Sequence, residues 1–535
     1  MRLTSKLLSS LSGVVALGLS AAAPAQAATP PDALVIAWNI DAISTFDPAQ
    51  LGEVVAIDTI VNICDRLMEY DPADETKVIP SLAESYTVSE DGKVLTFKIR
   101  QGMSFPSGNP ATAADMAWSL QRVVKLGLGA SASLTEYGFN KDTIESTITA
   151  PDDTTLVMQL DRPYPPSLIL QAIASYPVAI MLDRETVMAN EINGDMGNKY
   201  LATHTECVGP YKLMRWNPGE VVLMQSNDNY WGDKPAMKTV LIRHVAEAAT
   251  QRLMLESGDI DVARDLTPED IDALEGKPGL TIERTLRPQL SYIALNNEFG
   301  PFTDPKARLA LRYLLDYDAM ESTILKGVGI IRQSPVQLGA VGALNEAEGR
   351  PFKLDIEKAK ALLAEAGVAP GTKLSLIVGT KPTDMAISQH FQENAAKAGL
   401  EVSVERMAGA QLFSKVRARE FQMAFLGWQS TVGDAHGMAS RLIYNPDNRI
   451  EAKLSQYPSW RSAYFSEEVN NRVTEALFET DPAKREALYH QIQIDQMQEG
   501  PQVIVFQSTS RIVHSDALKN WTFHGFRSFY NKVTK

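Results

Sequence analysis

The sequence predicts an α/β protein with more than one lobe, and two observations support this prediction. The chain has 535 residues, and single hydrophobic cores stop growing at about 250–300 residues. In its second half, apolar runs of strand length alternate with amphipathic helical patterns. Such alternation is typical of βα units around a mixed or parallel sheet. Hydrophobic residues make up 44% and charged residues 22%, as in ordinary soluble globular proteins.

The first 27 residues are predicted to be a signal peptide. Arg2 and Lys6 precede an apolar run over 7–23, and Ala25-Gln26-Ala27 fits the small-x-small cleavage rule. A membrane anchor is the less favoured alternative, because the run is short and rich in Ser, Gly and Ala. No Cys follows the run directly, which disfavours a lipid anchor. We therefore expect a soluble protein in an oxidising compartment, the periplasm of a Gram-negative cell.

The charge and the cysteines narrow the function classes. The formal net charge is −14, and removal of the two cations of the signal peptide changes it to −16. An acidic chain without a basic stripe is a poor nucleic-acid binder. Export permits a disulfide between the two cysteines, Cys64 and Cys207. Two buried thiols are the alternative, but we favour the bridge, which would be a local staple.

The first half of the chain begins with a predicted buried strand over 33–39, a loop over 43–48 and a helix over 54–67. A hairpin follows, because Asp91-Gly92 separates two apolar runs and residues 95–99 alternate between apolar and polar. Thr112 is expected to cap the next helix, with Asp115 as its capping-box partner. Further strands are predicted over 143–160, 206–228 and 240–245, and a helix from about residue 248.

The second half opens with a predicted strand over 292–297. Asp304 and Pro305 then begin a helix. Residues 355–366 form a clean amphipathic helix, capped by Asp355 and stopped by Gly367. Strands are predicted over 374–379, 401–405, 421–427 and 503–507.

Several of these segments contain short sequence motifs, and the order of these motifs along the chain resembles that in one protein family. They include P-x-L-A-E-S at 80–85 and F-x-x-G-x-P-x-T-A-x-D at 105–115, then V-G-P-Y-K-L at 208–213 and N-x-x-Y-W-G-x-K-P at 227–235. Glu247, Arg252, Gly258 and Asp261 continue the pattern. The chain resembles the peptide-type periplasmic solute-binding proteins of ABC transporters (family 5, the dipeptide, oligopeptide and nickel binders). It departs from them at Pro106 and Ser107, where the family usually has His and Asp.

The resemblance implies a periplasmic-binding-protein-like type II fold, with two α/β lobes joined by a hinge plus an extra small lobe. Lobe I would comprise 28–65, 200–285 and 503–535, the small lobe 66–199, and lobe II 286–502. The implied function is capture of a peptide or peptide-like solute and its delivery to an inner-membrane ABC permease. The chain would act as a monomer, without a cofactor.

The resemblance and the positions of polar and aromatic residues suggest a set of ligand-binding candidates. On the first side of the cleft these are Trp38, Thr45, Phe46, Asp47, Val208 and Gly209; on the second side they are Asn296, Asn297, Arg332, Gln333, Lys381, Trp428, Thr431 and Asp434. Trp428 would be an aromatic wall, and Arg332 or Lys381 would hold an anionic group.

The family's peptide anchors are displaced in this chain. Dipeptide and oligopeptide binders hold the ammonium with an Asp three residues after a Gly-Trp pair, and Thr431 stands at that place. Asp434 would take over the role if it turns inward, and otherwise it is a solvent-facing loop acid. An opine-like conjugate, a sugar conjugate or a metal complex is therefore kept as an alternative solute.

Catalytic motifs are absent from the sequence. It contains no HExxH, P-loop, GxGxxG or GxSxG pattern, and its seven histidines show no metal-ligand spacing. His436 follows Asp434 by two residues, a pair that we interpret as a solvated loop. We therefore expect a binding protein, with an exported hydrolase as the alternative from another class.

Overall fold

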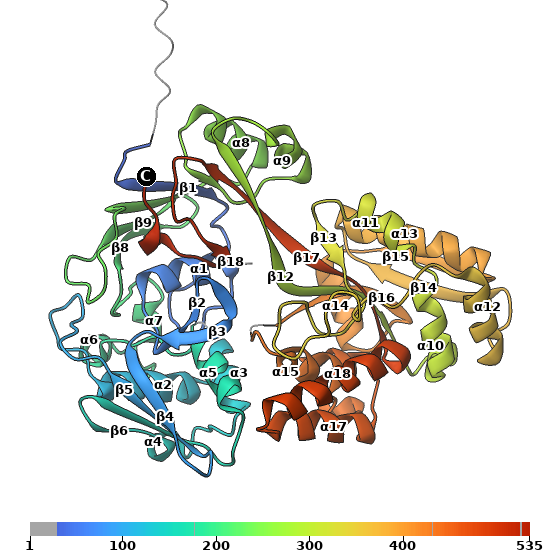
Figure 1. The fold of residues 1–535 in the computed structure, drawn as a ribbon, viewed down its shortest axis with the longest axis horizontal. Helices are drawn as coiled ribbons and strands as arrows, with labels where there is room; N and C mark the ends of the chain where they lie inside the picture. The colour runs from blue at the N-terminus through green and yellow to red at the C-terminus, as the bar shows by residue number, and fades with distance from the viewer. Residues whose placement is uncertain (1–28, 176, 431, 525–526) are drawn as a thin grey trace, which may run out of the picture.

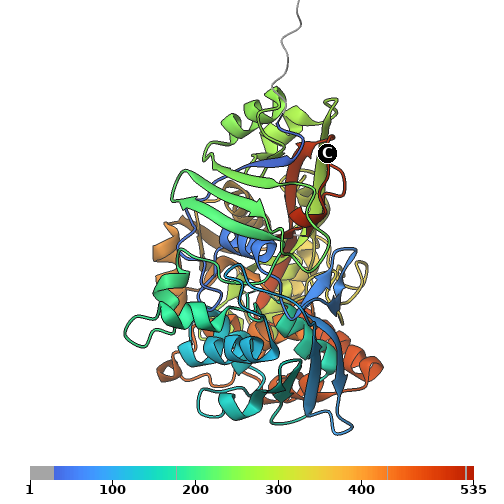
Figure 2. The same cartoon turned by 90° about the vertical axis from the view of Figure 1, so that its left-hand side faces the viewer.

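The computed structural model describes residues 29–175, 177–430, 432–524 and 527–535. The predicted signal peptide and Thr431 lie outside the described residues. Figure 1 shows a left-hand body and a right-hand body, joined by two long strands that run diagonally between them. Figure 2 faces the left-hand body, in which one α/β part lies above a second, smaller part.

One large mixed sheet extends through both bodies. Among the described residues it has eleven strands, ten of them in the order β15-β14-β16-β12-β17-β11-β1-β10-β9-β8, with β13 paired to β17. Their bounds are β15 Leu400–Arg406, β14 Thr372–Val378, β16 Met423–Gln429, β12 Leu280–Leu295, β17 Gln502–Ser515, β11 Val262–Ala263, β1 Ala33–Trp38, β10 Thr239–His244, β9 Val221–Ser226, β8 Tyr211–Asn217 and β13 Gly329–Ile331. The α/β prediction is confirmed.

The antiparallel strands β12 and β17 join the two bodies. One end of β17 pairs with β11, where Val262 lies opposite His514, and the other end of β12 pairs with β16. The segment 280–289 of β12 is partly exposed, whereas Leu290–Leu295 are buried. A hinge motion of one body against the other would therefore act on this partly exposed stretch and leave the buried end of β12 unchanged.

Lobe I packs α1 (Val54–Ile63), α8 (Ala248–Ser257) and α9 (Pro268–Leu274) against its part of the sheet. Strand β1 runs parallel to both β10 and β11 and is buried along its whole length. The chain ends beside it with β18 (Phe523–His524), β19 (Arg527–Ser528) and the short helix η5 (Tyr530–Lys532).

A disulfide joins Cys64, at the end of α1, to Cys207, and the two Cα atoms are 5.4 Å apart. The predicted pairing is therefore confirmed. Gly209 lies in the same corner, and a Cβ on it would sit 1.9 Å from the carbonyl oxygen of Ile63. The V-G-P-Y word thus reflects close backbone packing against the end of α1.

The small lobe contains the antiparallel sheet β4-β5-β7-β6 and the hairpin β2-β3. The strands are β2 Met68–Asp71, β3 Asp74–Pro80, β4 Ala83–Val88, β5 Val94–Ile99, β6 Ile148–Asp152 and β7 Thr155–Gln159. The helices are α2 Ala113–Leu126, η1 Gly129–Ser131, α3 Ala132–Thr135, α4 Ile144–Thr147, α5 Pro166–Ala174, α6 Arg184–Ala189 and α7 Asn198–Leu201. The predicted turn of β4 and β5 is confirmed, with Gly92 at φ +69°. The carboxylate of Asp115 accepts hydrogen bonds from the backbone and hydroxyl of Thr112, as predicted.

Lobe II surrounds β14, β15 and β16 with helices. These are η2 Gly300–Thr303, α10 Pro305–Arg312, α11 Tyr317–Ser322, α12 Ile356–Glu365, α13 Pro382–Lys397, α14 Gly409–Arg417, α15 Ala435–Met438, the π-helical turn η3 Ala439–Ile443, η4 Ile450–Ala452, α16 Pro458–Arg461, α17 Glu467–Phe478 and α18 Pro482–Glu499. Helix α12 begins after Asp355, which accepts from the backbone of Lys358, and is followed by Gly367 at φ +72°.

The predicted lobe boundaries at 285/286 and 502/503 fall within β12 and at the start of β17. We therefore retain the three-lobe division as a proposal and use its names below.

Candidate ligand-binding cleft

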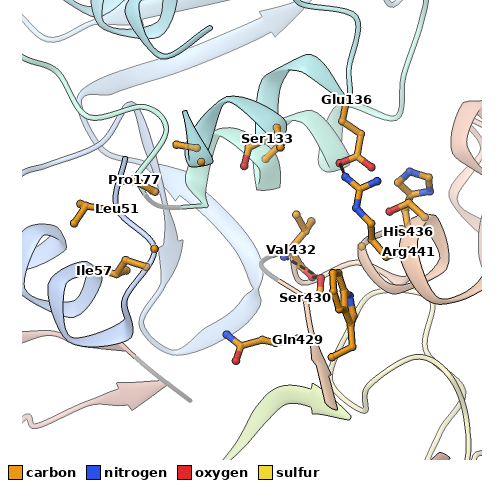
Figure 3. A pocket seen from close by; sticks show the side chains of 18 of the residues that line it. Leu51, Ile57, Ser133, Glu136, Pro177, Gln429, Ser430, Val432, His436 and Arg441 are labelled. Carbon is orange, nitrogen blue, oxygen red and sulfur yellow. Dashed lines mark hydrogen bonds and ion pairs between the residues drawn. The ribbon is translucent and has the colours of Figure 1, made fainter. Parts of the chain in front are cut away.

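A cavity of about 400 Å³ lies where the three lobes meet, and we call it the inner cavity (Figure 3). Lobe I lines it with the segment 50–57, the small lobe with 129–137, Ala172 and Pro177, and lobe II with 428–441. Its volume is in the range typical of small-molecule sites. Contributions from both sides of the cleft are what a two-lobed protein needs to enclose a solute.

A second cavity of about 510 Å³, the outer cavity, adjoins the first. Five residues line both cavities: Ala132, Glu136, His436, Ser440 and Arg441. The outer cavity adds the rings of Tyr444, Tyr457 and Phe478 and the side chain of Arg162. It therefore has an aromatic wall with a cationic edge.

The two sides of the cleft are in direct contact at the outer cavity. The ring of Tyr164 in the small lobe lies 5.3 Å from that of Phe478 in lobe II, between centroids. The guanidinium of Arg162 lies 5.0 Å from the centroid of the same Phe478 ring. Val432, Leu477 and Phe478 all pack against the core of the small lobe. The two sides of the cleft are thus closed against each other at the outer cavity.

The lobe I wall is held in place by a buried ion pair. Asp47 receives two hydrogen bonds from the guanidinium of Arg122, at 2.7 and 2.6 Å, and both side chains are fully buried. The same carboxylate accepts from the backbone of Ala49 and from the side chain of Asn198. Asp47 therefore fixes the loop that carries Gln50 and Leu51 to the cavity.

The lobe II wall has an equivalent support. Asp434 receives hydrogen bonds from both terminal nitrogens of Arg485, at 2.7 and 2.8 Å, and one from the backbone of His436. The Nδ1 atom of His436 lies 2.9 Å from the hydroxyl of Tyr489. Burial lowers the pKa of His436 to about 4, so its ring is neutral at pH 7.

Among the described residues, one ion pair crosses the cleft. Glu136, which directly follows α3, lies 3.2 Å from Arg441 in η3. The side chains of Glu136 and Arg441 are 26% and 21% exposed. This pair is therefore much less buried than the two supporting pairs. On its lobe II side, the guanidinium of Arg441 also lies 4.9 Å from the centroid of Tyr457. Figure 3 shows the pair beside His436.

Trp428 lines the inner cavity and carries an unpartnered donor. This half-buried ring stands at the end of β16, and its Nε1 atom is buried without an acceptor. A buried donor without a partner is costly, and this one lies behind the surface of the cavity, because the atom itself has almost no accessible area. The predicted place of Trp428 on the cavity wall agrees with the structure.

The other lobe I candidates lie away from the cavity. Trp38 packs 3.7 Å under the guanidinium of Arg264, and Phe46 packs edge to face on Trp216. The hydroxyl of Thr45 accepts from the backbone of Asp47. Val208 belongs to the small-lobe core, and the Gly209 carbonyl accepts from Asn227. The prediction that these five residues face the solute is corrected, because each one packs against other residues or makes a hydrogen bond inside the protein.

The lobe II candidates need the same correction, apart from Trp428 and the undescribed Thr431. Arg332 is 1% exposed and donates only to the backbone carbonyls of Val336, Leu344 and Asn345. Gln333 pairs with the backbone of Phe352. Asn296 and Asn297 donate to carbonyls of their own lobe.

Lys381 and Asp434 also differ from the prediction. Lys381 is exposed at the start of α13 and does not line either cavity. Asp434 is fully buried, neither turned into the cavity nor facing solvent. His436 is buried as well, so the pair is not a solvated loop.

Sequence reasoning missed the residues that carry charge into the cleft, Glu136 and Arg441. They are 305 positions apart, and neither belongs to a sequence word of the kind described above. The sequence motifs shared with the family lie at positions of backbone packing and helix capping. Of these motifs, only Gly427-Trp428 contributes a residue to the cavity wall.

The described part of the chain contains neither a metal-binding cluster nor a membrane-spanning helix. No group of three or more His, Cys, Asp and Glu side chains there is arranged to hold a metal ion. No described helix combines the length and the apolar character that a membrane span requires.

Comparisons with known proteins agree with this architecture. The family model of the bacterial extracellular solute-binding proteins, family 5 Middle, matches residues 77–449. The chain is 28% identical to the probable D,D-dipeptide-binding periplasmic protein DdpA of Escherichia coli K12, over 94% of this chain and 93% of the relative. It is 26% identical to the glutathione-binding protein GsiB of Escherichia coli O1:K1 / APEC, over 92% of each chain.

A solved structure shares the fold. The periplasmic binding protein DppA of Helicobacter pylori, in complex with the peptide STSA, superposes with a TM-score of 0.73 at 24% identity. The match covers 94% of this chain and 98% of the other. The predicted type II fold is confirmed by this likeness.

Proposed function

Because the chain belongs to the bacterial extracellular solute-binding proteins of family 5, we propose that it is the substrate-binding component of an ABC importer. Its solute is a peptide or peptide-like molecule, captured between the lobes and delivered to an inner-membrane permease. We place the protein in the periplasm, as a soluble monomer without a nucleic-acid partner, after removal of residues 1–27. The names of its relatives, which include D,D-dipeptide and glutathione binders, support this choice of solute.

One observation of the structure carries the proposal. The inner cavity takes its wall from all three lobes, and its lining combines aromatic rings with one carboxylate and one guanidinium. A short peptide with free ends has the same inventory of groups, an apolar or aromatic body with one charge of each sign. The fit concerns chemical class and size, because about 400 Å³ lies toward the small end of ligand pockets.

Ligand-dependent thermal unfolding tests the proposal. The protein is titrated with a library of di- to pentapeptides and small metabolites, and each mixture is analysed afterwards for consumption of the compound. A solute that binds only the native state stabilises it by about 2.7 kcal/mol at a concentration of 100 times Kd. Stabilisation by a peptide that is recovered intact would support a transport binder.

Two other results would contradict the proposal. Consumption of the stabilising compound would favour an exported hydrolase. Stabilisation by sugars alone, with no peptide active, would move the solute to the hydroxyl-rich class. Stabilisation by an opine-like conjugate or a metal complex, with no peptide active, would likewise favour the non-peptide alternative.

A further inference from the structure

We propose that Glu136 and Arg441 are exchangeable charge anchors for a zwitterionic solute. The ammonium group of the solute pairs with Glu136 and its carboxylate pairs with Arg441, in place of the ion pair that the two residues make with each other. This inference rests on the proposed function and adds the end groups and the orientation of the solute. The amino end would face the small lobe and the carboxyl end lobe II.

The position of the pair supports an anchoring role. The two side chains come from opposite sides of the cleft, meet at 3.2 Å and line both cavities. Figure 3 shows their contact at one edge of the residues that line the inner cavity. A zwitterion bound between them would link the small lobe to lobe II, just as the ion pair does. The solute would thereby hold the cleft closed in place of the direct contact.

The charges around the cavity favour a solute with one charge of each sign. Glu136 and Arg441 are the two fully charged side chains among the residues that line the inner cavity, because His436 is neutral. The nearby acids Asp47 and Asp434 are already bound to arginines through two hydrogen bonds each. A solute with a single charged group would leave one of the two anchors unmatched.

The pair is also suited to exchange its partners. It makes a single contact between partly exposed side chains, and such pairs contribute little to stability. The ring of Trp428 in the same wall offers an aromatic surface to the body of the solute. Three groups of the cavity would thus match the two ends and the centre of a dipeptide.

The test combines variants of the anchors with ligands whose ends are blocked. The probes are alanyl-alanine in its L,L and D,D forms, each as the free zwitterion, the N-acetyl derivative and the C-terminal amide. Binding is measured by calorimetry with the wild-type protein, Glu136→Gln and Arg441→Gln. For the wild type, blocking either end should raise Kd about tenfold, which corresponds to ~1.4 kcal/mol.

Each variant should no longer distinguish the free from the blocked form at one end of the dipeptide. Glu136→Gln should bind the N-acetyl form at least as well as the free dipeptide, because Arg441 is released while the ammonium has lost its partner. It should still prefer the free carboxylate over the amide. Arg441→Gln should show the opposite pattern. A reversed pair, Glu136→Lys with Arg441→Glu, should restore both preferences with the dipeptide turned end to end.

The possible failures can be told apart. If the wild type binds none of the six probes, both the dipeptide specificity and the anchors are contradicted. If it binds the free dipeptides but the variants keep both end-group preferences, or weaken all forms equally, the anchors alone are wrong. Lys306→Gln with Glu365→Gln, which removes a surface pair of lobe II at 2.8 Å outside both cavities, is the matched control and should leave every preference unchanged. Circular dichroism of each variant checks that it is folded.

Discussion

The two ion pairs behind the cleft walls differ from the one that crosses the cleft. Asp47–Arg122 and Asp434–Arg485 are held by two hydrogen bonds each, and in both pairs the acid is fully buried. Glu136–Arg441 makes one contact and is partly exposed. Each supporting pair also lies on a single side of the cleft, whereas the crossing pair joins the two sides.

The difference separates structural charges from charges that a solute can reach. A buried, doubly bonded carboxylate has no free oxygen facing the cavity, and removal of its partner leaves an uncompensated charge. It can shape a wall, but it cannot exchange partners when the cleft opens. A partly exposed pair loses little when it separates. The following predictions test this contrast.

The largest effect is expected from Arg485→Ala. This change leaves the Asp434 carboxylate buried without its cation, and breaking a buried pair in this way costs about 3–5 kcal/mol. Urea unfolding followed by circular dichroism measures the loss in the free energy of unfolding. Arg122→Ala is the matched variant on the other side of the cleft, because it removes the cation that pairs with Asp47. A loss below about 1 kcal/mol in both would show that these pairs are no stronger than surface pairs.

A buried acid without a doubly bonded arginine should behave differently. Asp65 accepts a hydrogen bond from Trp231 at 2.8 Å, and burial, followed by the charge of Glu69, raises its pKa to about 7. Between the ordinary pKa of about 4 and pH 7, the unfolded chain releases this proton while the folded protein retains it. The contribution of Asp65 to stability is therefore fully present below about pH 4 and is lost as pH rises to 7.

Asp65→Asn tests this sign. The variant keeps an oxygen for Trp231 and has no charge to bury, so its stability relative to the wild type should rise from pH 4 to 7 and then level off. The maximum gain is on the order of 4 kcal/mol, from about three pKa units at 1.36 kcal/mol each. Thermal unfolding of both proteins at pH 4, 5.5, 7 and 8.5 measures it. A difference that does not change with pH would refute the raised pKa.

Trp428→Phe should raise stability slightly and leave solute binding nearly unchanged. The substitution keeps an aromatic wall on the inner cavity but removes the Nε1 donor, which is buried and has no acceptor in the protein. Removal of a buried unpartnered donor should stabilise the fold by about 1 kcal/mol, measured by thermal unfolding. Affinity for the peptide found in the thermal-shift screen, measured by calorimetry, should change by less than this amount. A clear loss of affinity would show that the donor reaches the solute in the complex.

Local features of the fold could be predicted from the sequence because their causes are local. The turn at Asp91-Gly92, the capping box of Thr112 and the limits of α12 all follow from residues within four positions of one another. The length of β12, in contrast, could not be predicted from the sequence. Only its buried end has a strand pattern, and the stretch 280–289 is partly exposed along nearly its whole length, so no alternation marks it.

The site was predictable only where a sequence word reaches the cavity, at Trp428. Asp47 and Asp434 are acids in loops at the right places, but their roles depend on arginines 75 and 51 positions away. The crossing pair depends on how two lobes close. Pairing over such distances is a property of the folded molecule, which a single sequence does not reveal.

The smallest effect is expected from Glu136→Gln on stability. Because the pair is partly exposed and makes one contact, the free energy of unfolding should change by less than about 1 kcal/mol, and the change should shrink further at high salt because screening weakens exposed charges. Arg441→Gln should behave alike, although it also loses the stacking on Tyr457. Urea unfolding of both single variants and the double variant at 0.05 and 0.5 M NaCl gives the coupling between the two residues. A coupling as large as the loss in Arg485→Ala would mean that the crossing pair is itself a structural support, and it could then not serve as a pair of exchangeable anchors.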